Sequence, residues 1–356
     1  MAAKDHPQSL TRAARAALLV ALAAPLPGTA GAQRVTFADL ASAPAAMARR
    51  RAAMDQLAST LSTAIGSTGR SGTWGVLVVS LTNGDTLFGF NPDRQLLPAS
   101  TMKLFTSALA LDQFGPSGRF ETKVLRSGTL RTDGTLDGDL VLRGAGDPTL
   151  GGRFADDAGT LPMVTLARSV AAAGVRRVSG ALVGDASGFD DGKVPDGWRR
   201  RYLHASYAAR VSALSFNENQ VIVLVRPDGR RADISFRPAV SGMDVSNNVR
   251  VLAGSRGASI RVRQDSIAGR IVISGWIGAK SPERDYKLVV ENPELFAVGA
   301  LRAALQAEGV TVDGPIRIAT PRDPLTPVAT LPSPTLDRII EQMNGESNNQ
   351  IGRAHV

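Results

Sequence analysis

Cysteine is absent from the 356-residue chain, and histidine occurs only three times. Without cysteine there is no disulfide scaffold, no thiolate nucleophile and no cysteine-ligated metal site, and three histidines leave little for zinc. Aromatic residues make up only 5% of the chain, which argues against a base-stacking surface for nucleic acid. The sequence therefore gives no reason to expect a metal or other cofactor, or a nucleic-acid partner.

The overall composition is that of a globular protein. Apolar residues make up 43% of the chain and charged residues 21%, which supplies ample material for a core. The length predicts two or three domains. The formal net charge of +9 suits an anionic neighbourhood such as a cell wall or a membrane surface, and it also favours solubility.

The first 32 residues have the pattern of a secretory signal peptide. A basic segment precedes an apolar run, Ala16 to Leu26, that is too short to span a bilayer. Ala30-Gly31-Ala32 supplies a small-residue cleavage site, so we expect cleavage before Gln33 and a periplasmic location. An uncleaved membrane anchor is the alternative.

The part of the chain that follows begins with a helix and a hairpin. Residues 33–66 carry apolar side chains at helical spacing. Trp74 to Leu81 is a β-rich run, too apolar for simple alternation, which predicts a strand covered on both faces. Asn83-Gly84 predicts a hairpin turn with Thr86 to Phe90 as the partner strand. Thr101 to Phe114 is predicted to be a helix.

From about Phe120 to Ile318 short β-type runs alternate with turn residues, which predicts one or two β-containing domains. The expected strands are Lys123–Leu130, Gly138–Arg143, Ala181–Gly184, Gln220–Val225, Ser259–Arg263 and Arg270–Gly275. Helices are expected at Pro162–Ala173 and Pro293–Glu308. A proline-rich connector, residues 321–334, then leads to an amphipathic helix at Leu336–Met343.

Ser100-Thr101-Met102-Lys103 is the one S-x-x-K sequence in the chain. Residues three apart share one helix face, so the hydroxyl and the amine can meet. A lysine whose pKa is lowered by burial can accept the serine proton, and the first helical turn offers free backbone N–H groups. The four residues alone favour a plainer interpretation, in which Ser100 caps the helix and Lys103 is solvated.

The surrounding sequence favours catalysis. Asn91 to Thr106 resembles the active-serine segment of penicillin-recognising serine peptidases, whose second motif is S-x-N. Three sequences fit that motif: Ser215-Phe216-Asn217 beside a β run, Ser246-Asn247-Asn248 in an expected polar loop, and Ser347-Asn348-Asn349. We select Ser347 and Asn349, because Met343 to Gln350 resembles the motif between two helices in the D-alanyl-D-alanine carboxypeptidase/D-alanyl-D-alanine-endopeptidase family. These are the class C low-molecular-mass penicillin-binding proteins.

Further motifs follow in the same order as in that family. They are Gly144–Leu150, Gly184–Phe189, Pro195–Trp198 and Tyr207–Asn219. The resemblance covers roughly Ala53 to Gln350. The long interval between Lys103 and Ser347 also resembles this family rather than β-lactamases, in which the two motifs lie closer together.

The resemblance implies an α/β, multi-domain fold. A β-lactamase/transpeptidase-like catalytic domain, incomplete at its C-terminus, would occupy residues 33–121 and 328–356. As in the family that the chain resembles, two β-rich domains would be inserted into the catalytic domain. Domain II would occupy residues 122–196 and 299–327, and domain III residues 197–298.

The resemblance also implies a serine-type D-Ala-D-Ala carboxypeptidase or endopeptidase that acts on peptidoglycan stem peptides and binds β-lactams. Ser100 would attack the penultimate D-alanine carbonyl and Lys103 would accept its proton. Ser347 would relay a proton to the departing amine, and Asn349 would hold the substrate amide or Lys103. Peripheral association with the membrane or cell wall fits the same role.

Two residues are candidates for substrate binding. By resemblance, Asp185 would line the pocket for a diaminopimelate side chain, with Phe189 nearby. The alternative for Asp185 is a turn aspartate, and Asp147 before Pro148 is predicted to be a turn former.

The chain departs from the family in one respect. No K-T-G, K-S-G or H-T-G sequence occurs in it, and we expect that the natural protein continues after Gln350. We therefore expect little or no carboxypeptidase activity from these 356 residues. The competing interpretations are a non-catalytic wall-binding homologue and a β-lactamase-like hydrolase.

Overall fold

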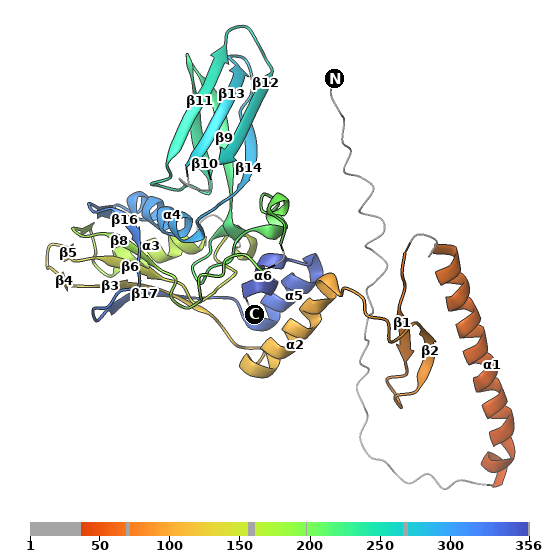
Figure 1. The fold of residues 1–356 in the computed structure, drawn as a ribbon. Coiled ribbons are helices and arrows are strands. Elements are labelled where there is room, and N and C mark those ends of the chain that lie inside the picture. The colour runs from red at the N-terminus through yellow and green to blue at the C-terminus, as the bar shows by residue number, and fades with distance from the viewer. Residues whose placement is uncertain (1–36, 69–71, 156–160, 197, 266–269, 355–356) are drawn as a thin grey trace. The chain divides into compact units, whose positions relative to one another are not determined.

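The computed structural model describes residues 37–68, 72–155, 161–196, 198–265 and 270–354, and the expected signal peptide lies outside these ranges. The chain divides into two compact units, one up to Leu97 and one from Pro98 onward, and each is described by itself (Figure 1). Within the described ranges, no helix combines the length and the apolar character needed to cross a membrane.

The first unit consists of a long helix and a hairpin. Helix α1 (Phe37–Thr68) confirms the predicted helix over the residues described. Strands β1 (Val76–Val79) and β2 (Thr86–Phe90) pair antiparallel, as the Asn83-Gly84 turn predicts. Gly84 has a φ of 76°, a left-handed conformation that glycine adopts without steric cost.

Strand β1 is more exposed than its composition suggests. Half-buried and exposed residues alternate along it, and Leu77 is 55% exposed. The prediction that both faces of this strand are covered is wrong for the described structure, because β1 and β2 form a two-stranded sheet there.

The second unit is built around a five-stranded sheet with strand order β16-β8-β6-β3-β17. Its strands are β3 (Glu121–Arg126), β6 (Leu140–Arg143), β8 (Leu182–Asp185), β16 (Ile316–Ile318) and β17 (Thr326–Pro332). Strands β6, β8 and β16 run parallel, and β3 runs antiparallel to both of its neighbours. A small sheet of order β15-β7-β5-β4 accompanies it, with β4 (Thr129–Leu130), β5 (Thr135–Asp137), β7 (Arg177–Val178) and β15 (Thr311–Val312).

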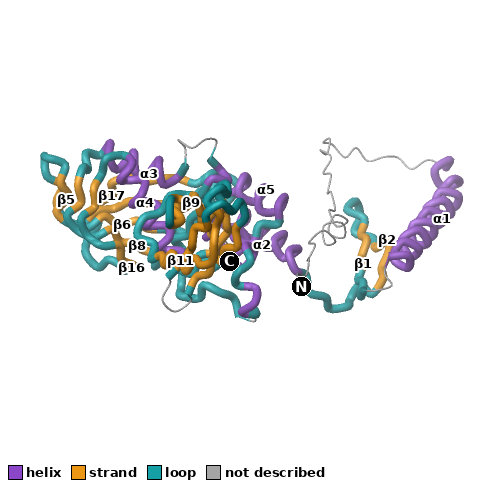
Figure 2. The backbone as a smooth tube through the Cα atoms, turned by 90° about the horizontal axis from the view of Figure 1, so that it is seen from above, coloured by secondary structure: helices purple, strands orange, loops and turns teal. Residues whose placement is uncertain are grey.

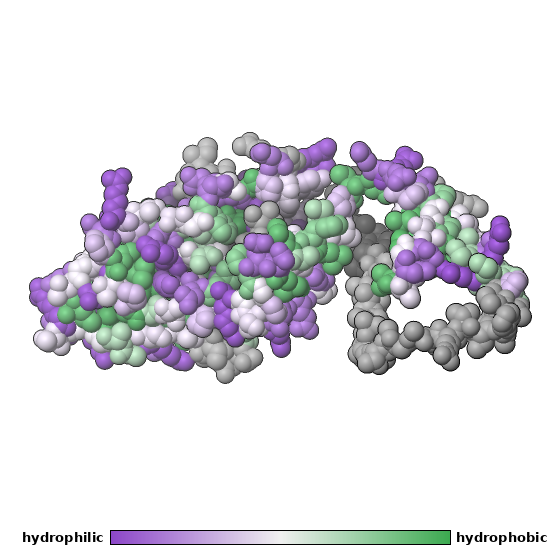
Figure 3. Space-filling view, turned by 90° about the horizontal axis from the view of Figure 1, so that it is seen from below, coloured by the Kyte–Doolittle hydropathy of each residue, from purple (hydrophilic) through white to green (hydrophobic). Residues whose placement is uncertain are grey.

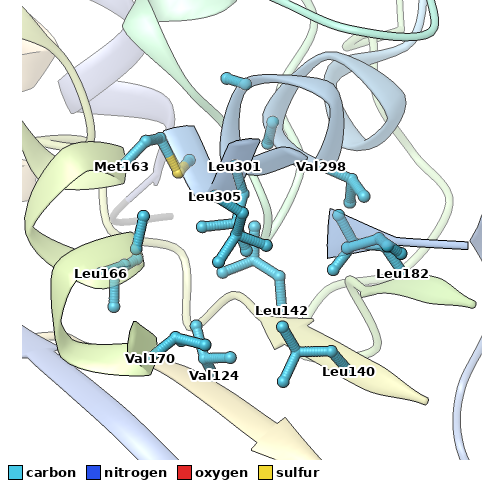
Figure 4. Packing of buried hydrophobic residues seen from close by; sticks show 14 of the residues in the cluster. Val124, Leu140, Leu142, Met163, Leu166, Val170, Leu182, Val298, Leu301 and Leu305 are labelled. Carbon is cyan, nitrogen blue, oxygen red and sulfur yellow. The ribbon is translucent and has the colours of Figure 1, made fainter. Parts of the chain in front are cut away.

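Helices α3 (Pro162–Ala172) and α4 (Pro293–Ala307) cover one face of the five-stranded sheet. Both begin at a proline, whose fixed φ suits the first helical turn, and the Asn292 side chain caps α4 by accepting a hydrogen bond from the Leu295 N–H (3.1 Å). Figure 4 shows that their apolar side chains meet those of the sheet. The core includes Val124, Leu140, Leu142, Met163, Leu166, Val170, Leu182, Val298, Leu301 and Leu305.

Strand β17 lies inside the segment that the sequence predicts to be a proline-rich connector. It is an edge strand of the sheet, paired only with β3. An edge strand tolerates proline because one side of it needs no N–H donors, and the pairing register shifts between Pro327 and Ala329. The prediction of a connector was therefore wrong for residues 326–332, which form a strand despite their prolines.

A six-stranded sheet with order β12-β13-β11-β10-β9-β14 forms a separate part of the second unit. Its strands are β9 (Gln220–Asp228), β10 (Arg231–Arg237), β11 (Val245–Leu252), β12 (Ala258–Gln264), β13 (Ile271–Gly278) and β14 (Arg284–Val289). Their inward side chains form a second core that includes Val223, Val225, Ile271, Ile273 and Ile277. Ser246-Asn247-Asn248 lies on β11, so its placement in a polar loop is wrong; the flanking valines pair in the sheet.

Three helices meet at the beginning and the end of the second unit. They are α2 (Met102–Phe114), α5 (Leu336–Glu346) and α6 (Asn349–Ala354). Figures 1 and 2 both show α2 beside α5. Ala110 of α2 packs against Leu336 and Ile340 of α5, while other apolar residues of α5 pack against Ile351 of α6. These contacts join the two ends of this unit.

The rest of α2 is largely exposed. Its buried residues are Ser107 and Ala110, whereas Leu104, Phe105 and Phe114 are 61%, 69% and 70% exposed. Figure 3 shows hydrophobic residues at the surface of the second unit at the end where α2 lies. Helix α2 is therefore held against α5 by one narrow face, which contains Ser107 and Ala110.

Replacing Leu142 with alanine should lower the free energy of unfolding by about 2–5 kcal/mol, because this side chain is fully buried between the sheet and α4. The matched control is Leu295→Ala on α4, where the leucine is 43% exposed; it should change stability by only about 0.5 kcal/mol. Urea unfolding followed by circular dichroism measures both. Equal losses would contradict the location of the core.

Candidate functional site

Ser100 lies where the chain turns into helix α2. A short 3-10 helix, η3 (Ala99–Thr101), leads directly into α2. Ala99 has a φ of 48°, a left-handed conformation that costs free energy for a residue with a Cβ. This turn places the exposed Ser100 at the start of the helical segment, as the sequence predicts.

The Lys103 amine contacts three side-chain oxygens. Lys103 Nζ lies 3.0 Å from Ser100 Oγ and 2.6 Å from Asn349 Oδ1. Ser347 Oγ is a more distant neighbour at 3.5 Å. The structure therefore brings together all four residues that the sequence selects as catalytic, although Asn349 is 246 positions from Lys103.

Burial lowers the pKa of the Lys103 ammonium below its ordinary value. Desolvation disfavours the charged form of a lysine, and no carboxylate is among the hydrogen-bond partners of Nζ in the described structure. A larger fraction of this amine is therefore neutral than of a fully solvated lysine. The amine also lies within hydrogen-bond reach of the Ser100 hydroxyl.

The turn between α5 and α6 is fixed by several contacts. Ser347 ends α5 with a φ of 55°, and Asn348 N–H donates to the Met343 carbonyl (3.0 Å). Next to Ser347, Glu346 forms an ion pair with Arg153, which also pairs with Glu218. Ser347 and Asn349 are thus held by a well-connected turn.

A hydrogen-bonded chain ties this turn to α2. Asn344 Nδ2 of α5 donates to Ser107 Oγ (3.0 Å). The same Ser107 hydroxyl donates to the backbone carbonyl of Lys103 (2.7 Å). The helix that carries the amine is therefore linked to the helix that precedes Ser347.

Residues 207–219 support Asn349 from the other side. Asn349 Nδ2 donates to the Tyr207 carbonyl (3.1 Å). Gln350 Nε2 contacts Ser215 Oγ (3.4 Å), and Ser215 donates to the Ser212 carbonyl (3.0 Å). Ser215 is buried, and it is not among the side chains that Lys103 Nζ contacts in the described structure. The first S-x-N candidate therefore supports the residue that follows Asn349 instead of supplying the catalytic serine.

A cavity of about 740 Å³ opens beside these residues. Ser100, Lys103 and Asn349 line it, together with Trp198, Tyr202 and Tyr207. The Tyr207 ring lies 6.4 Å from each of the other two aromatic rings, measured between centroids. The polar groups thus share the cavity with an aromatic wall that can bury apolar parts of a ligand.

Asp185 and Phe189 are placed differently from the four residues around Lys103. The Asp185 carboxylate is buried and accepts hydrogen bonds from Arg143 Nε (2.7 Å) and Ser187 N–H (3.1 Å). Phe189 lies against Gly146, where an added Cβ would come within 2.5 Å of the ring, and it lines a second cavity of about 430 Å³. Neither residue is among the described residues that line the cavity at Ser100, and their role in substrate binding stays a prediction.

Asp147 forms the turn that the sequence predicts. Its Oδ1 accepts hydrogen bonds from the Thr149 N–H (2.8 Å) and hydroxyl (2.7 Å). Oδ2 is buried without a hydrogen-bond partner. Burial raises the pKa of this carboxyl, and the bonds from Thr149 only partly oppose that effect.

Across the part of the chain that the structure describes, no three histidine or acidic side chains gather as a metal site would require. The chemistry that this arrangement can perform is that of a serine hydroxyl beside a partly desolvated amine.

Comparisons with known proteins identify the family. The family model of the D-Ala-D-Ala carboxypeptidase 3 (S13) family matches residues 54–356. The chain belongs to this family. A D-alanyl-D-alanine carboxypeptidase of Actinomadura sp. (strain R39) is 32% identical over 252 residues, covering 68% of this chain and 45% of the relative. The chain spans about half the length of the curated relatives it matches.

Solved structures show the same fold. The crystal structure of penicillin binding protein 4 (dacB) from Haemophilus influenzae has a TM-score of 0.62 at 22% identity, covering 79% of this chain and 61% of that chain. The same protein complexed with a novel β-lactam gives a TM-score of 0.54 at 21% identity, with 79% and 59% covered. The α/β, transpeptidase-like fold expected for this S13 family member is therefore confirmed.

The aromatic wall was not predicted as part of the site. Pro195–Trp198 and Tyr207–Asn219 resemble family motifs, and that resemblance assigns no function to their aromatic residues. Their signal was the clustering of three aromatic residues within ten positions, 198–207, in a chain with few of them. The backbone carbonyl of Tyr207 has no sequence signal at all, since every residue has one.

The two buried carboxylates should respond oppositely to removal of their charge. Asp147→Asn should raise stability at neutral pH by about 1 kcal/mol, since it removes an incompletely paired buried charge. That gain should vanish as the pH falls through the raised native pKa of Asp147 toward its unfolded value, where both states bind the proton.

Asp185→Asn, the matched variant, should lower stability at neutral pH. Burial raises the pKa of Asp185, but hydrogen bonds from Ser187 and Arg143 outweigh it and lower the pKa below its ordinary value. The stability of that contact is present above the unfolded pKa and is lost as the pH falls through the lowered native pKa. Melting temperatures against pH measure both variants; changes of the same sign would contradict this account.

Proposed function

We propose that the protein is a serine-type D-Ala-D-Ala carboxypeptidase and endopeptidase that acts on peptidoglycan stem peptides through an acyl-enzyme on Ser100. One observation carries the proposal: Lys103 Nζ contacts both Ser100 Oγ (3.0 Å) and Asn349 Oδ1 (2.6 Å). A lysine next to a helix-start serine can act as its base only when its amine is oriented and neutral. Asn349 supplies the orientation, and desolvation favours neutrality.

The reaction begins when Ser100 Oγ attacks the carbonyl carbon of the penultimate D-alanine. Lys103 accepts the hydroxyl proton as the new C–O bond forms. Collapse of the tetrahedral intermediate breaks the peptide bond, and the departing amine of the terminal D-alanine takes a proton through Ser347, which lies 3.5 Å from Lys103 Nζ. Water then attacks the ester, and Ser100 recovers its proton.

The tetrahedral intermediate carries a negative charge on the former carbonyl oxygen, and N–H donors stabilise that charge. The Ser100 backbone N–H, at the start of a helical segment, is one candidate donor to the oxyanion. Loss of one such donor costs about 3 kcal/mol in comparable sites.

The substrate would extend from Ser100 along the aromatic wall. Trp198, Tyr202 and Tyr207 offer an apolar surface, while the Tyr207 carbonyl is already occupied by Asn349. The side chain of the third stem-peptide residue would extend toward Asp185 and Phe189, in keeping with the family resemblance. β-Lactams would acylate Ser100, as the likeness to the β-lactam-bound Haemophilus influenzae structure suggests.

The domain arrangement and the location belong to the same proposal. Residues 33–121 and 328–356 would form the transpeptidase-like domain, with residues 122–196 and 299–327 as domain II and residues 197–298 as domain III. The protein would be exported and cleaved before Gln33. The whole chain carries a net charge of +9, and removal of residues 1–32, with Lys4, Arg12, Arg15 and Asp5, leaves +7. That positive charge supports peripheral association with the anionic cell wall or membrane.

Fluorescent penicillin tests the nucleophile in the protein expressed from its whole gene. Wild-type protein should be labelled, and Ser100→Ala should abolish labelling because the attacking oxygen is gone. Ser347→Ala should slow labelling by about 100-fold or more, the range for loss of a proton-transfer group. D-alanine release from a diacyl-L-Lys-D-Ala-D-Ala peptide should fall in parallel.

The matched control is Ser246→Ala, which removes the serine of the other Ser-Asn-Asn sequence, on β11. It should label at the wild-type rate. A folded protein that binds peptidoglycan but is not labelled would identify the non-catalytic wall-binding homologue instead.

The rate of penicillin acylation should rise with pH through the lowered pKa of Lys103 and level off above it, because only the neutral amine accepts a proton. Asn349→Asp should shift the rising limb upward by about one to three pH units, since a carboxylate beside the ammonium stabilises its charged form. Asn248→Asp on β11 is the control and should leave the profile unchanged. An unshifted profile in Asn349→Asp would mean that another group is the base.

A further inference from the structure

The outward face of strands β11, β12 and β13 carries positive charge without negative charge. The three strands contain Arg250, Arg261 and Arg263 but no aspartate or glutamate, and Arg256 lies in the loop between β11 and β12. All four arginines are exposed. None of them has an ion-pair partner among the residues that the structure describes.

The strand register places these side chains on one face. Trp276 of β13 lies opposite Ser259 of β12 and Arg250 of β11, and in the next outward row Arg261 lies opposite Ser274. Side chains alternate between the two faces of a strand, and Ile271, Ile273 and Ile277 of β13 are buried in the inner core. Figure 1 shows the three strands side by side.

Two other arginines in or beside this sheet form ion pairs. Arg226 of β9 forms an ion pair with Asp233 of β10 (3.0 Å). At the strand starts, Arg270 forms an ion pair with Asp244 (2.8 Å). We call the surface that carries Arg250, Arg256, Arg261 and Arg263 the basic face.

Apolar side chains lie within the basic face. Trp276 is partly exposed and its ring lies over Gly257, where an added Cβ would come within 3.1 Å of Cη2. Leu252, on the same side of β11 as Arg250, is 40% exposed. Tryptophan beside arginine is the combination that favours the boundary between lipid headgroups and hydrocarbon.

We propose that the basic face docks on an anionic membrane surface, with the arginines against lipid phosphates and Trp276 at the headgroup level. A soluble polyanion would match the arginines but would leave Trp276 and Leu252 without a partner. Each arginine near an anionic bilayer strengthens partitioning by about fivefold. Four arginines together support reversible, salt-sensitive binding. This inference rests on the peripheral association proposed above and gives it a surface. None of the residues around Lys103 takes part, so its failure would leave the proposed catalysis intact.

Cosedimentation with vesicles tests the proposal. The full chain should bind vesicles that contain phosphatidylglycerol, bind vesicles of phosphatidylcholine alone far less, and be released by salt. The triple variant Arg250→Gln, Arg261→Gln, Arg263→Gln should lose binding by on the order of 100-fold. The control variant Arg94→Gln, Arg322→Gln, Arg338→Gln removes the same charge from other elements and should keep at least half of the binding. Circular dichroism verifies that both variants fold.

A second measurement locates the contact. Spin-labelled lipid in the anionic vesicles should quench tryptophan fluorescence, and Trp276→Phe should remove that quenching. Equal loss of binding in the two triple variants would overturn the proposal, because binding would then follow net charge alone. Binding to immobilised heparin without binding to vesicles would also overturn it, in favour of a soluble polyanion.

Discussion

The site depends on one amine that joins the two ends of the second unit. Lys103 Nζ contacts Ser100 in its own helical turn and Asn349 far along the chain. A lysine side chain is long and flexible, and holding it in one position costs side-chain entropy. The packing of α5 against α2, together with the Asn344–Ser107 hydrogen bond, keeps its partners in place. Desolvation of the amine is a consequence of the same packing.

The region between the two catalytic sequences forms part of the site. Residues 207–219 hold Asn349 and Gln350 through backbone carbonyls and Ser215, and Arg153 holds Glu346 from another direction. The aromatic wall comes from the same region. A long insertion between motifs can therefore carry structural contacts to the catalytic turn and a surface for ligand, besides the remote six-stranded sheet.

Buried charge and exposed charge have separate roles in this molecule. Asp185 is fully buried and satisfied by Arg143 and Ser187, which makes it a structural group whatever its part in binding. Asp147 is buried with one oxygen unpartnered, a cost that the surrounding fold must offset. The arginines of β11–β13 are solvated and contribute little to stability. Their effect is on the field outside the protein, which is where a charged partner would meet it.

Local elements and the identity of the reactive pair follow from the order of residues in the chain. The Asn83-Gly84 turn, the helices at α3 and α4 and the i, i+3 spacing of Ser100 and Lys103 all depend on neighbours in the chain, and each was predicted. Tertiary structure alone decided the rest. It selected Ser347 over Ser246 and Ser215 as the serine that faces Lys103, and family resemblance anticipated that choice where residue spacing left it open. The proline-containing segment β17 forms a strand because it lies at the edge of a sheet. Tertiary structure also places Trp198, Tyr202 and Tyr207 at the cavity. The position of each of these residues depends on which distant segment donates a hydrogen bond to it or excludes water from it. A local sequence pattern contains no information about that distant segment.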